Sequence, residues 1–280
     1  MAAIKPQNPL NLRAVKCTTG CSKLDALLAG GVPCGLVTEL VGESTAGKTQ
    51  LCLQLVLTAL LPKSLGGISS SSLYIHSEFP FPLRRLDALS RSFSQTTSCL
   101  PDPPLDHILV RGVHSATDLL AVLDRVHFLM SGPSQSSGQL PIGLIVIDSI
   151  AALFRADFDC NAVDMRRRSG MFFAIAVRLK HLASRFGVAI VVTNQVMDIL
   201  NEEKVRVGNY EYVWSSGRKV GAALGLGWGS CVNVRLFLSK TASSVMTDDN
   251  RRKMMVVFGP HLPKGSCEFV IRRHGVFGIS

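Results

Sequence analysis

Short, almost uninterrupted apolar runs alternate along this chain with longer segments whose apolar residues recur at helical spacing. The apolar runs fall near residues 36–41, 73–76, 107–110, 142–149 and 188–193. Such runs are typical of strands that are buried on both faces of a parallel sheet. The intervening segments, near residues 48–61, 81–93, 115–130 and up to about 185, predict helices. This alternation predicts an α/β fold with a mostly parallel sheet flanked by helices.

The last third of the chain has a different pattern. The segments CVNVRLFLSK, KMMVVFGP and CEFVIRR alternate like strands joined by turns, which predicts an antiparallel C-terminal extension of the sheet. Before it, residues 151–168 predict a loop of mixed charge, and residues 196–222 predict a long irregular connection. Residues 1–16 predict a flexible lead-in, so one core domain is expected over residues 17–280.

Composition limits the function classes. With a net charge of +10, the chain of 280 residues is expected to have a polyanionic partner or substrate, such as nucleic acid, nucleotide or anionic lipid. A merely basic enzyme is the alternative. No apolar run approaches the roughly 20 residues that span a bilayer, so no membrane association is expected. The 8 cysteines form no C-x-x-C pair and no signal peptide is visible, which predicts reduced thiols in an intracellular protein rather than a zinc site.

The strongest motif lies between the first apolar run and the first long helix. It consists of Gly42, Glu43, Ser44, Thr45, Ala46, Gly47, Lys48 and Thr49, and it matches the phosphate-binding P-loop pattern G-x-x-x-x-G-K-[ST] at every specified position. Glycines allow backbone N–H groups to point at phosphate oxygens, and the following helix presents its positive end. Lys48 can reach the β- and γ-phosphates, and Thr49 can offer its hydroxyl to Mg²⁺. Asp148, at the end of a buried strand, is the expected second residue of the metal site.

Candidates for the remaining chemistry follow two other strands. Ser149 stands where many P-loop ATPases place a water-activating glutamate, so the base must come from elsewhere, and Glu78 is the best candidate. Gln195 can hydrogen-bond a γ-phosphate and report its presence to the long connection that follows. Plain structural roles, a solvated loop glutamate and a strand-end turn, remain the alternatives for both residues.

Basic and aromatic side chains gather in the two irregular stretches. The basic ones are Arg155, Arg166, Arg167, Arg168, Lys204, Arg206, Arg218 and Lys219, with Tyr210, Tyr212 and Trp214 interleaved. Such a mixture can bind a phosphate backbone and stack on exposed bases, which predicts contact with single-stranded nucleic acid. Acidic residues in the same stretches dilute the positive charge, among them Asp157, Asp159, Asp164, Glu202, Glu203 and Glu211.

Taken together, these motifs resemble those of the RecA family, and specifically its eukaryotic recombinase paralogues. The matching segments are TGCSKLDALLAGGVPCGLVTEL, GESTAGKTQLCLQL, YIHSE, LIVIDSIAALFR, FGVAIVVTNQV and GPHLP, between Thr19 and Gly278. The resemblance implies a RecA-like P-loop core that binds ATP with Mg²⁺, with Glu78 as hydrolytic base, Gln195 as γ-phosphate sensor and Arg85 near the adenine. It also implies two DNA-binding loops, a nuclear location, a heteromer with another recombinase paralogue, and assistance to the main recombinase on single-stranded or branched DNA.

The sequence also departs from the family pattern. No room is expected for an N-terminal helical DNA-binding domain, and no Phe-x-x-Ala tether is evident in the lead-in. Phe258 stands where an acidic residue is expected, and Phe79-Pro80 replaces Gly-Thr after Glu78. We therefore expect an ATP-binding component of a homologous recombination repair complex, with weak or partner-dependent, DNA-stimulated hydrolysis. The alternatives are a scaffold subunit with a structural ATP site and a small-molecule kinase.

Overall fold

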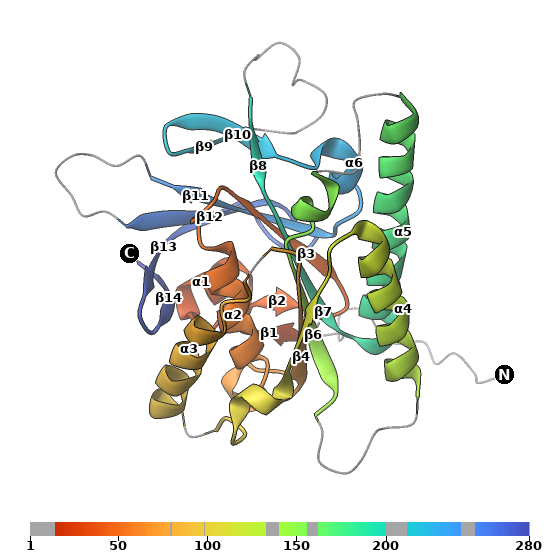
Figure 1. Cartoon of the computed structure of the whole chain (residues 1–280). Coiled ribbons are helices and arrows are strands. Elements are labelled where there is room, and N and C mark those ends of the chain that lie inside the picture. Colours follow the sequence, from red (N-terminus) through yellow and green to blue (C-terminus); the bar gives the residue numbers. More distant parts are fainter. Residues whose placement is uncertain are drawn as a thin grey trace, which may run out of the picture.

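A nine-stranded sheet organises the computed structural model, which describes residues 15–78, 80–97, 99–132, 140–155, 162–199, 212–241 and 250–279. Its strands are β3 (Val37–Gly42), β4 (Ser71–His76), β5 (Ile108–Gly112), β6 (Ile142–Asp148), β7 (Ala189–Asn194), β11 (Val234–Lys240), β12 (Arg251–Phe258), β13 (Ser266–Arg272) and β14 (Gly275–Gly278). The order across the sheet is β14-β13-β12-β11-β3-β7-β6-β4-β5 (Figure 1). Pairing is parallel from β11 to β5 and antiparallel from β11 to β14. The predicted fold class is therefore confirmed.

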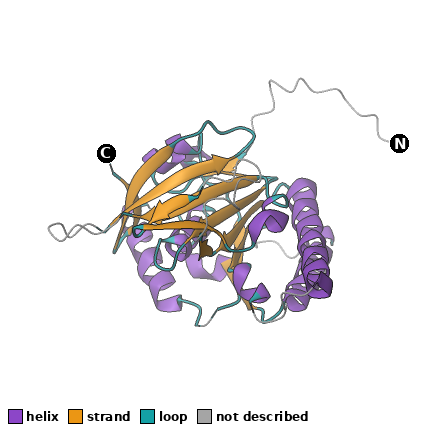
Figure 2. Ribbon diagram, turned by 90° about the horizontal axis from the view of Figure 1, so that it is seen from above, coloured by secondary structure: helices purple, strands orange, loops and turns teal. Residues whose placement is uncertain are grey.

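Helices cover both faces of this sheet, as Figure 2 shows from above. The α-helices are α1 (Ser22–Leu27), α2 (Lys48–Thr58), α3 (Leu83–Thr96), α4 (Ala116–Ser131), α5 (Ala162–Phe186) and α6 (Gly225–Gly229). Short 3-10 turns occur at Lys63–Leu65, Pro104–His107 and Ala151–Phe154. None of the described helices is long and apolar enough to span a membrane.

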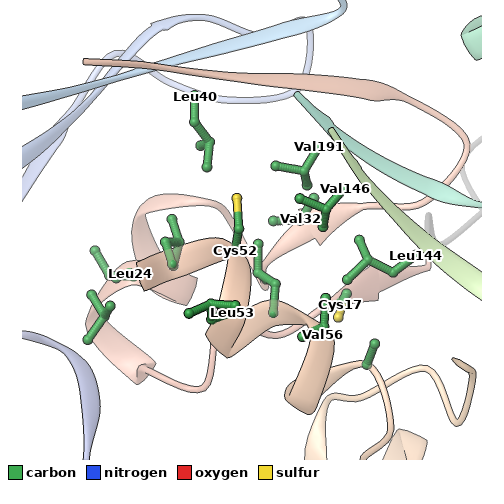
Figure 3. Close-up of a cluster of buried hydrophobic side chains, with 14 of the residues drawn as sticks. Cys17, Leu24, Val32, Leu40, Cys52, Leu53, Val56, Leu144, Val146 and Val191 are labelled. Atoms are coloured by element: carbon green, nitrogen blue, oxygen red, sulfur yellow. The ribbon is translucent and has the colours of Figure 1, made fainter. Parts of the chain in front are cut away.

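Two hydrophobic cores follow from the alternation of side chains along the central strands. On β6, Leu144 and Val146 pack into a core with α1, α2 and α3, while Ile145 and Ile147 pack into a second core with α4, α5 and α6. Figure 3 shows part of the first core, where Cys52 lies against the inward side chains of the sheet. Because both faces of these strands are buried, their sequence is continuously apolar.

Two small sheets complete the described chain. β1 (Lys16–Cys17) pairs with β2 (Val32–Pro33), so the folded part already includes Lys16, the last residue of the predicted lead-in. β8 (Val196–Asp198), β9 (Val213–Ser215) and β10 (Arg218–Ala222) form a sheet in the order β8-β10-β9. This sheet packs on the large one through a cluster of buried residues from three strands, Val41, Val220 and Phe237.

Two parts of the loop prediction were wrong. The helix α5 begins at Ala162, so residues 162–168 are helical, because alanine, methionine and arginine favour helix and extend the buried helix backwards. The stretch 196–222 contains β8, β9 and β10 rather than only a connection. Ser216 and Gly217, both with positive φ (50° and 74°), form the two-residue turn of a β9–β10 hairpin. The short strand β14 was also missed, since its glycines weaken the apolar pattern.

Candidate functional site

The predicted P-loop connects β3, at the centre of the sheet, to α2. Its backbone has positive φ at Thr45 (64°) and Gly47 (108°), which curls the loop over the start of α2. A β-carbon on Gly42 would lie 2.6 Å from the Leu238 carbonyl oxygen, and one on Gly47 would lie 2.9 Å from Ile271 Cδ1. Both positions therefore require glycine, and the loop keeps the close curvature that phosphate binding needs.

Lys48 begins α2 and turns back over the loop. Its Nζ donates hydrogen bonds to the carbonyl oxygens of Gly42 (2.6 Å) and Glu43 (2.9 Å). Burial lowers the pKa of Lys48, and the negative charges of Asp148 and Glu78 oppose this effect. A cation that is partly desolvated and held in the loop is well placed to exchange its carbonyl partners for phosphate oxygens.

The Asp148 carboxylate accepts hydrogen bonds from three other side chains of the site. Its Oδ2 accepts hydrogen bonds from the hydroxyls of Thr49 (2.7 Å) and Tyr74 (2.6 Å), and its Oδ1 accepts one from Thr193 (2.6 Å). Thr49 lies on α2, Tyr74 on β4 and Thr193 on β7, so the carboxylate joins elements on three sides. Burial raises the pKa of Tyr74, and the nearby Asp148 charge adds to this, so the phenol stays a donor.

The two strand-end candidates, Glu78 and Gln195, contact each other. Gln195 Nε2 donates to Glu78 Oε1 at 3.1 Å, and an Arg155 guanidinium nitrogen lies 3.2 Å from the same oxygen. The two strands that precede these residues, β4 and β7, flank β6, which carries Asp148. The fold thus brings Glu78 and Gln195 to the same edge of the sheet as the P-loop.

The side chain of Glu43, in the P-loop, contacts the β9–β10 hairpin. Its carboxylate Oε1 accepts hydrogen bonds from Ser215 (2.5 Å) and Ser216 (2.6 Å) at the tip of the β9–β10 hairpin, and Arg218 lies 3.4 Å from Oε2. Burial alone raises the pKa of Glu43, but the two serine hydroxyls and the charges of Lys240 and Arg218 outweigh it and lower the pKa. Glu43 is therefore held as a carboxylate.

Two arginines flank the loop. Arg85 on α3 donates to Gln50 Oε1 (2.7 Å) and to the carbonyl oxygens of Arg273 (2.7 Å) and Arg272 (2.8 Å), which ties α2 to the β13–β14 turn. Arg252 on β12 donates to the Thr45 carbonyl oxygen at 3.1 Å. Sequence reasoning named Arg85 but missed Arg252, because nothing in the sequence brings β12 beside the P-loop.

The basic residues predicted to bind nucleic acid separate into groups. Lys204 and Arg206 lie outside the described residues. Arg155 pairs with Glu78, and Arg218 pairs with Asp198 and Glu43, so both are engaged within the chain. The others are Arg166 and Arg167 at the start of α5, Arg168 against the Phe172 ring, and Lys219 of β10 over two aromatic rings. Figure 1 shows α5 and the small sheet of β8, β9 and β10 as separate elements.

Sequence reasoning also missed Tyr74 and Thr193. Both lie inside apolar strand segments, YIHS and VVTN, where a polar residue one or two positions before the strand end was the available signal. Their hydroxyls are useful only because β4 and β7 flank β6, and that neighbourhood is set by the sheet order.

A nucleotide triphosphate with Mg²⁺ fits this set of groups. The loop offers backbone N–H groups and Lys48 to phosphate oxygens, and the Thr49 hydroxyl lies beside the Asp148 carboxylate, as hard oxygen ligands for Mg²⁺ require. This fold and this site define a RecA-like P-loop protein with a polar side chain at a neighbouring strand end.

Comparison with known proteins identifies the family. A family model described as Rad51 matches residues 11–279, so the chain belongs to the Rad51 family. The chain is 44% identical to the DNA repair protein XRCC3 homolog of Arabidopsis thaliana, over 99% of this chain and 98% of that protein. It is 31% identical to DNA repair protein XRCC3 of Bos taurus (99% and 78%), and 33% identical to DNA repair protein RAD51 of Saccharomyces cerevisiae (92% and 58%). Within the family, the chain is thus similar to XRCC3 proteins over nearly its full length.

Proposed function

We propose that the protein is an ATP-binding recombinase paralogue that acts in homologous recombination repair of DNA double-strand breaks. It works in a complex that assists the main recombinase on single-stranded or branched DNA. The observation that carries the proposal is the meeting of Lys48, Thr49, Asp148 and the Glu78–Gln195 pair at one sheet edge of a Rad51-family chain.

The P-loop residues Gly42–Thr49 would hold the phosphates of ATP, and Thr49 with Asp148 would hold Mg²⁺. The metal, when bound, neutralises charge on the phosphate oxygens. Tyr74 and Thr193 fix the Asp148 carboxylate, so that it faces Thr49 in one orientation. Arg85 joins α2 to the β13–β14 turn, and its place near the adenine stays a prediction.

Hydrolysis is proposed to be weak or dependent on a partner. Glu78 is the candidate base, but one of its oxygens already accepts the Gln195 amide and faces Arg155. Both contacts restrict rotation of the Glu78 carboxylate, so a partner or DNA that draws Arg155 away would release the base.

The proposed heteromer has a suitable surface at the edge of the sheet. β5 is an edge strand of the nine-stranded sheet, and among the described residues its outer edge pairs with no other strand. Leu109 on this strand is 50% exposed, and a cavity of about 760 Å³ lies between β5 and α4. Its lining combines apolar side chains with polar and charged ones: Leu73, Val113, Val122, Val126 and Leu129 beside Arg111, His114, Asp118 and Arg125. An extended segment of another recombinase paralogue can pair with β5 and place an apolar side chain in this cavity. A nuclear location is part of the same proposal, since the DNA substrate lies there.

The test measures ATP affinity in the presence of Mg²⁺ for the whole chain and for Lys48→Ala, with Lys180→Ala as a control on the exposed face of α5. We expect Lys48→Ala to weaken ATP binding at least about tenfold, because a charge-assisted phosphate contact contributes roughly 1.5–3 kcal/mol. The control should bind like the parent. Equal affinity in all three proteins contradicts the nucleotide site.

A second measurement tests the complex. Leu109→Glu should abolish co-purification with a recombinase paralogue, while Val177→Glu, which changes an exposed apolar residue of α5, should not. If co-purification survives Leu109→Glu, β5 is not the surface that contacts the paralogue. That result does not bear on the proposed ATP site.

A structural ATP site is the second candidate, and the engaged Glu78 favours it. In that case ATP stabilises the fold by mass action but is not turned over, even with a partner and DNA. A rise of the melting temperature with ATP, combined with no phosphate release by the full complex, distinguishes this scaffold from the ATPase.

A further inference from the structure

The β9–β10 hairpin links the P-loop to an exposed aromatic surface. Side chains on its two strands alternate between a buried and an exposed face. Ser215 and Val220 are buried, while Trp214 is 58% exposed. Tyr212 and Trp214 pack edge to face with centroids 6.4 Å apart, and Lys219 Nζ lies 4.6 Å and 5.6 Å from the two rings. The hairpin therefore has a tip against the Glu43 side chain and an outer face made of two rings and a cation.

The tip is held by a residue of the P-loop itself. The Glu43 carboxylate accepts the Ser215 and Ser216 hydroxyls, and Ser215 Oγ also accepts the backbone N–H of Lys240 at 2.9 Å. The Ser216 N–H donates to the Lys240 carbonyl oxygen at 3.1 Å, which fixes the turn on β11. The hairpin has a second anchor at Asp198, whose two oxygens each lie 3.0 Å from Arg218.

The same Glu43 also contacts the lysine of the loop. Lys48 Nζ donates to the Glu43 carbonyl oxygen at 2.9 Å. Phosphate oxygens compete for this ammonium group, and the Glu43 peptide loses its charged donor when Lys48 turns to them. A change at Lys48 is thus passed to the Glu43 backbone, and from the Glu43 side chain to the hairpin tip.

We propose that Glu43 is a positioning residue that couples nucleotide binding in the P-loop to a base-stacking surface formed by Tyr212, Trp214 and Lys219. The ligand of that surface is an unpaired base of single-stranded nucleic acid, which stacks on the exposed indole while Lys219 attracts the adjoining phosphate. The inference rests on the proposed function, because it requires that the chain binds ATP. This coupling differs from the one predicted for Gln195. Gln195 would report the γ-phosphate to the chain that follows it, beginning with β8, whereas Glu43 acts from within the P-loop.

The test uses the whole chain and its two tryptophans. Trp228 is fully buried, so iodide quenches only Trp214. We expect ATP with Mg²⁺ to change the iodide quenching of Trp214, and to raise affinity for a fluorescent oligothymidine by about fivefold or more, the usual lower range of site-to-site coupling. In Ser215→Ala/Ser216→Ala, both responses should disappear while ATP affinity stays at the parent value.

Two further variants control for backbone effects. Ser216→Gly removes the hydroxyl yet suits the positive φ, so it should weaken both responses as the alanine variant does. Ser230→Ala removes a hydroxyl that bonds within α6 and should leave both responses intact. Trp214→Ala should weaken oligothymidine binding about tenfold, since stacking contributes roughly 1–3 kcal/mol per base.

The outcomes separate the inference from the function on which it rests. Absence of ATP binding by the parent chain overturns both. ATP binding without a Trp214 response, or a full response in Ser215→Ala/Ser216→Ala, overturns the Glu43 link alone. If Trp214→Ala keeps its oligothymidine affinity but loses co-purification with a recombinase paralogue, the aromatic surface is a protein contact and the nucleic-acid assignment is wrong.

Discussion

Removing Arg235 from the centre of the sheet should severely destabilise the protein. The Arg235 side chain is 2% exposed and donates through Nε to Glu39 Oε2 at 2.5 Å, and Glu39 is 0% exposed. The other Glu39 oxygen accepts the Asn194 amide at 2.7 Å. Arg235, Glu39 and Asn194 lie on the adjacent strands β11, β3 and β7, and Asn194 immediately precedes Gln195.

The size of the effect follows from the burial of both charges. Arg235→Met leaves the Glu39 carboxylate buried with one amide donor, and breaking a buried pair in this way costs about 3–5 kcal/mol. A domain has a free energy of unfolding of about 5–15 kcal/mol, so the loss is at least about a fifth of that free energy. The double variant Glu39→Met/Arg235→Met removes both charges and leaves the Asn194 amide unsatisfied, at about 1–3 kcal/mol. It should therefore be more stable than Arg235→Met alone.

Urea unfolding followed by far-ultraviolet circular dichroism measures these differences. Arg251→Met is the matched control, because Arg251 is 48% exposed and pairs with Glu268 at 3.5 Å on the next strands. Such a surface pair contributes about 0–1 kcal/mol. A loss below about 1 kcal/mol in Arg235→Met, or a double variant destabilised by the sum of the single changes, would refute the role given to the buried pair.

Three other predictions concern the site and the surface. Glu78→Gln should keep ATP affinity but reduce DNA-stimulated phosphate release by the complex about 100-fold, as loss of a general base does; unchanged release rules out that role. Neutralising Arg166 and Arg167 together should make the slope of log K against log salt concentration for single-strand binding shallower by about 1.4, and an unaltered slope assigns DNA contact to a partner. Iodoacetamide at pH 8 should alkylate the exposed Cys99 before Cys17, because burial raises the pKa of Cys17 to about 12; equal labelling shows that the first core opens readily.

Local chemistry made much of this protein predictable from its sequence. The P-loop was identifiable because phosphate binding needs glycine at Gly42 and Gly47, and the structure shows backbone or side-chain atoms where a β-carbon would lie at either position. The parallel strands were identifiable because burial on both faces leaves a continuous apolar run, as in β6 and β7. The start of the helix predicted near residues 115–130 also depends on local chemistry, since the Ser115 hydroxyl accepts the Asp118 N–H where α4 begins.

Partnerships between distant residues were decided by the tertiary structure. Glu43 and Ser216 are 173 positions apart, and the Glu39–Arg235 pair spans 196. No periodicity encodes such contacts, because they depend on which strands become neighbours in the sheet. The hairpin of residues 213–222 was missed for a related reason: its strands are short, and their stability comes from packing on Val41 and Phe237 rather than from local propensity.

The sequence alone therefore determined the nucleotide-binding motif, the fold class and the family resemblance, since each depends on residues close together in the chain. The tertiary structure alone showed that Asp148 is held by Tyr74 and Thr193, and that Arg155 and Arg218 are engaged within the chain. A charged side chain has the same letter whether it faces solvent or a buried partner. Its role is fixed only when folding sets the distance to that partner.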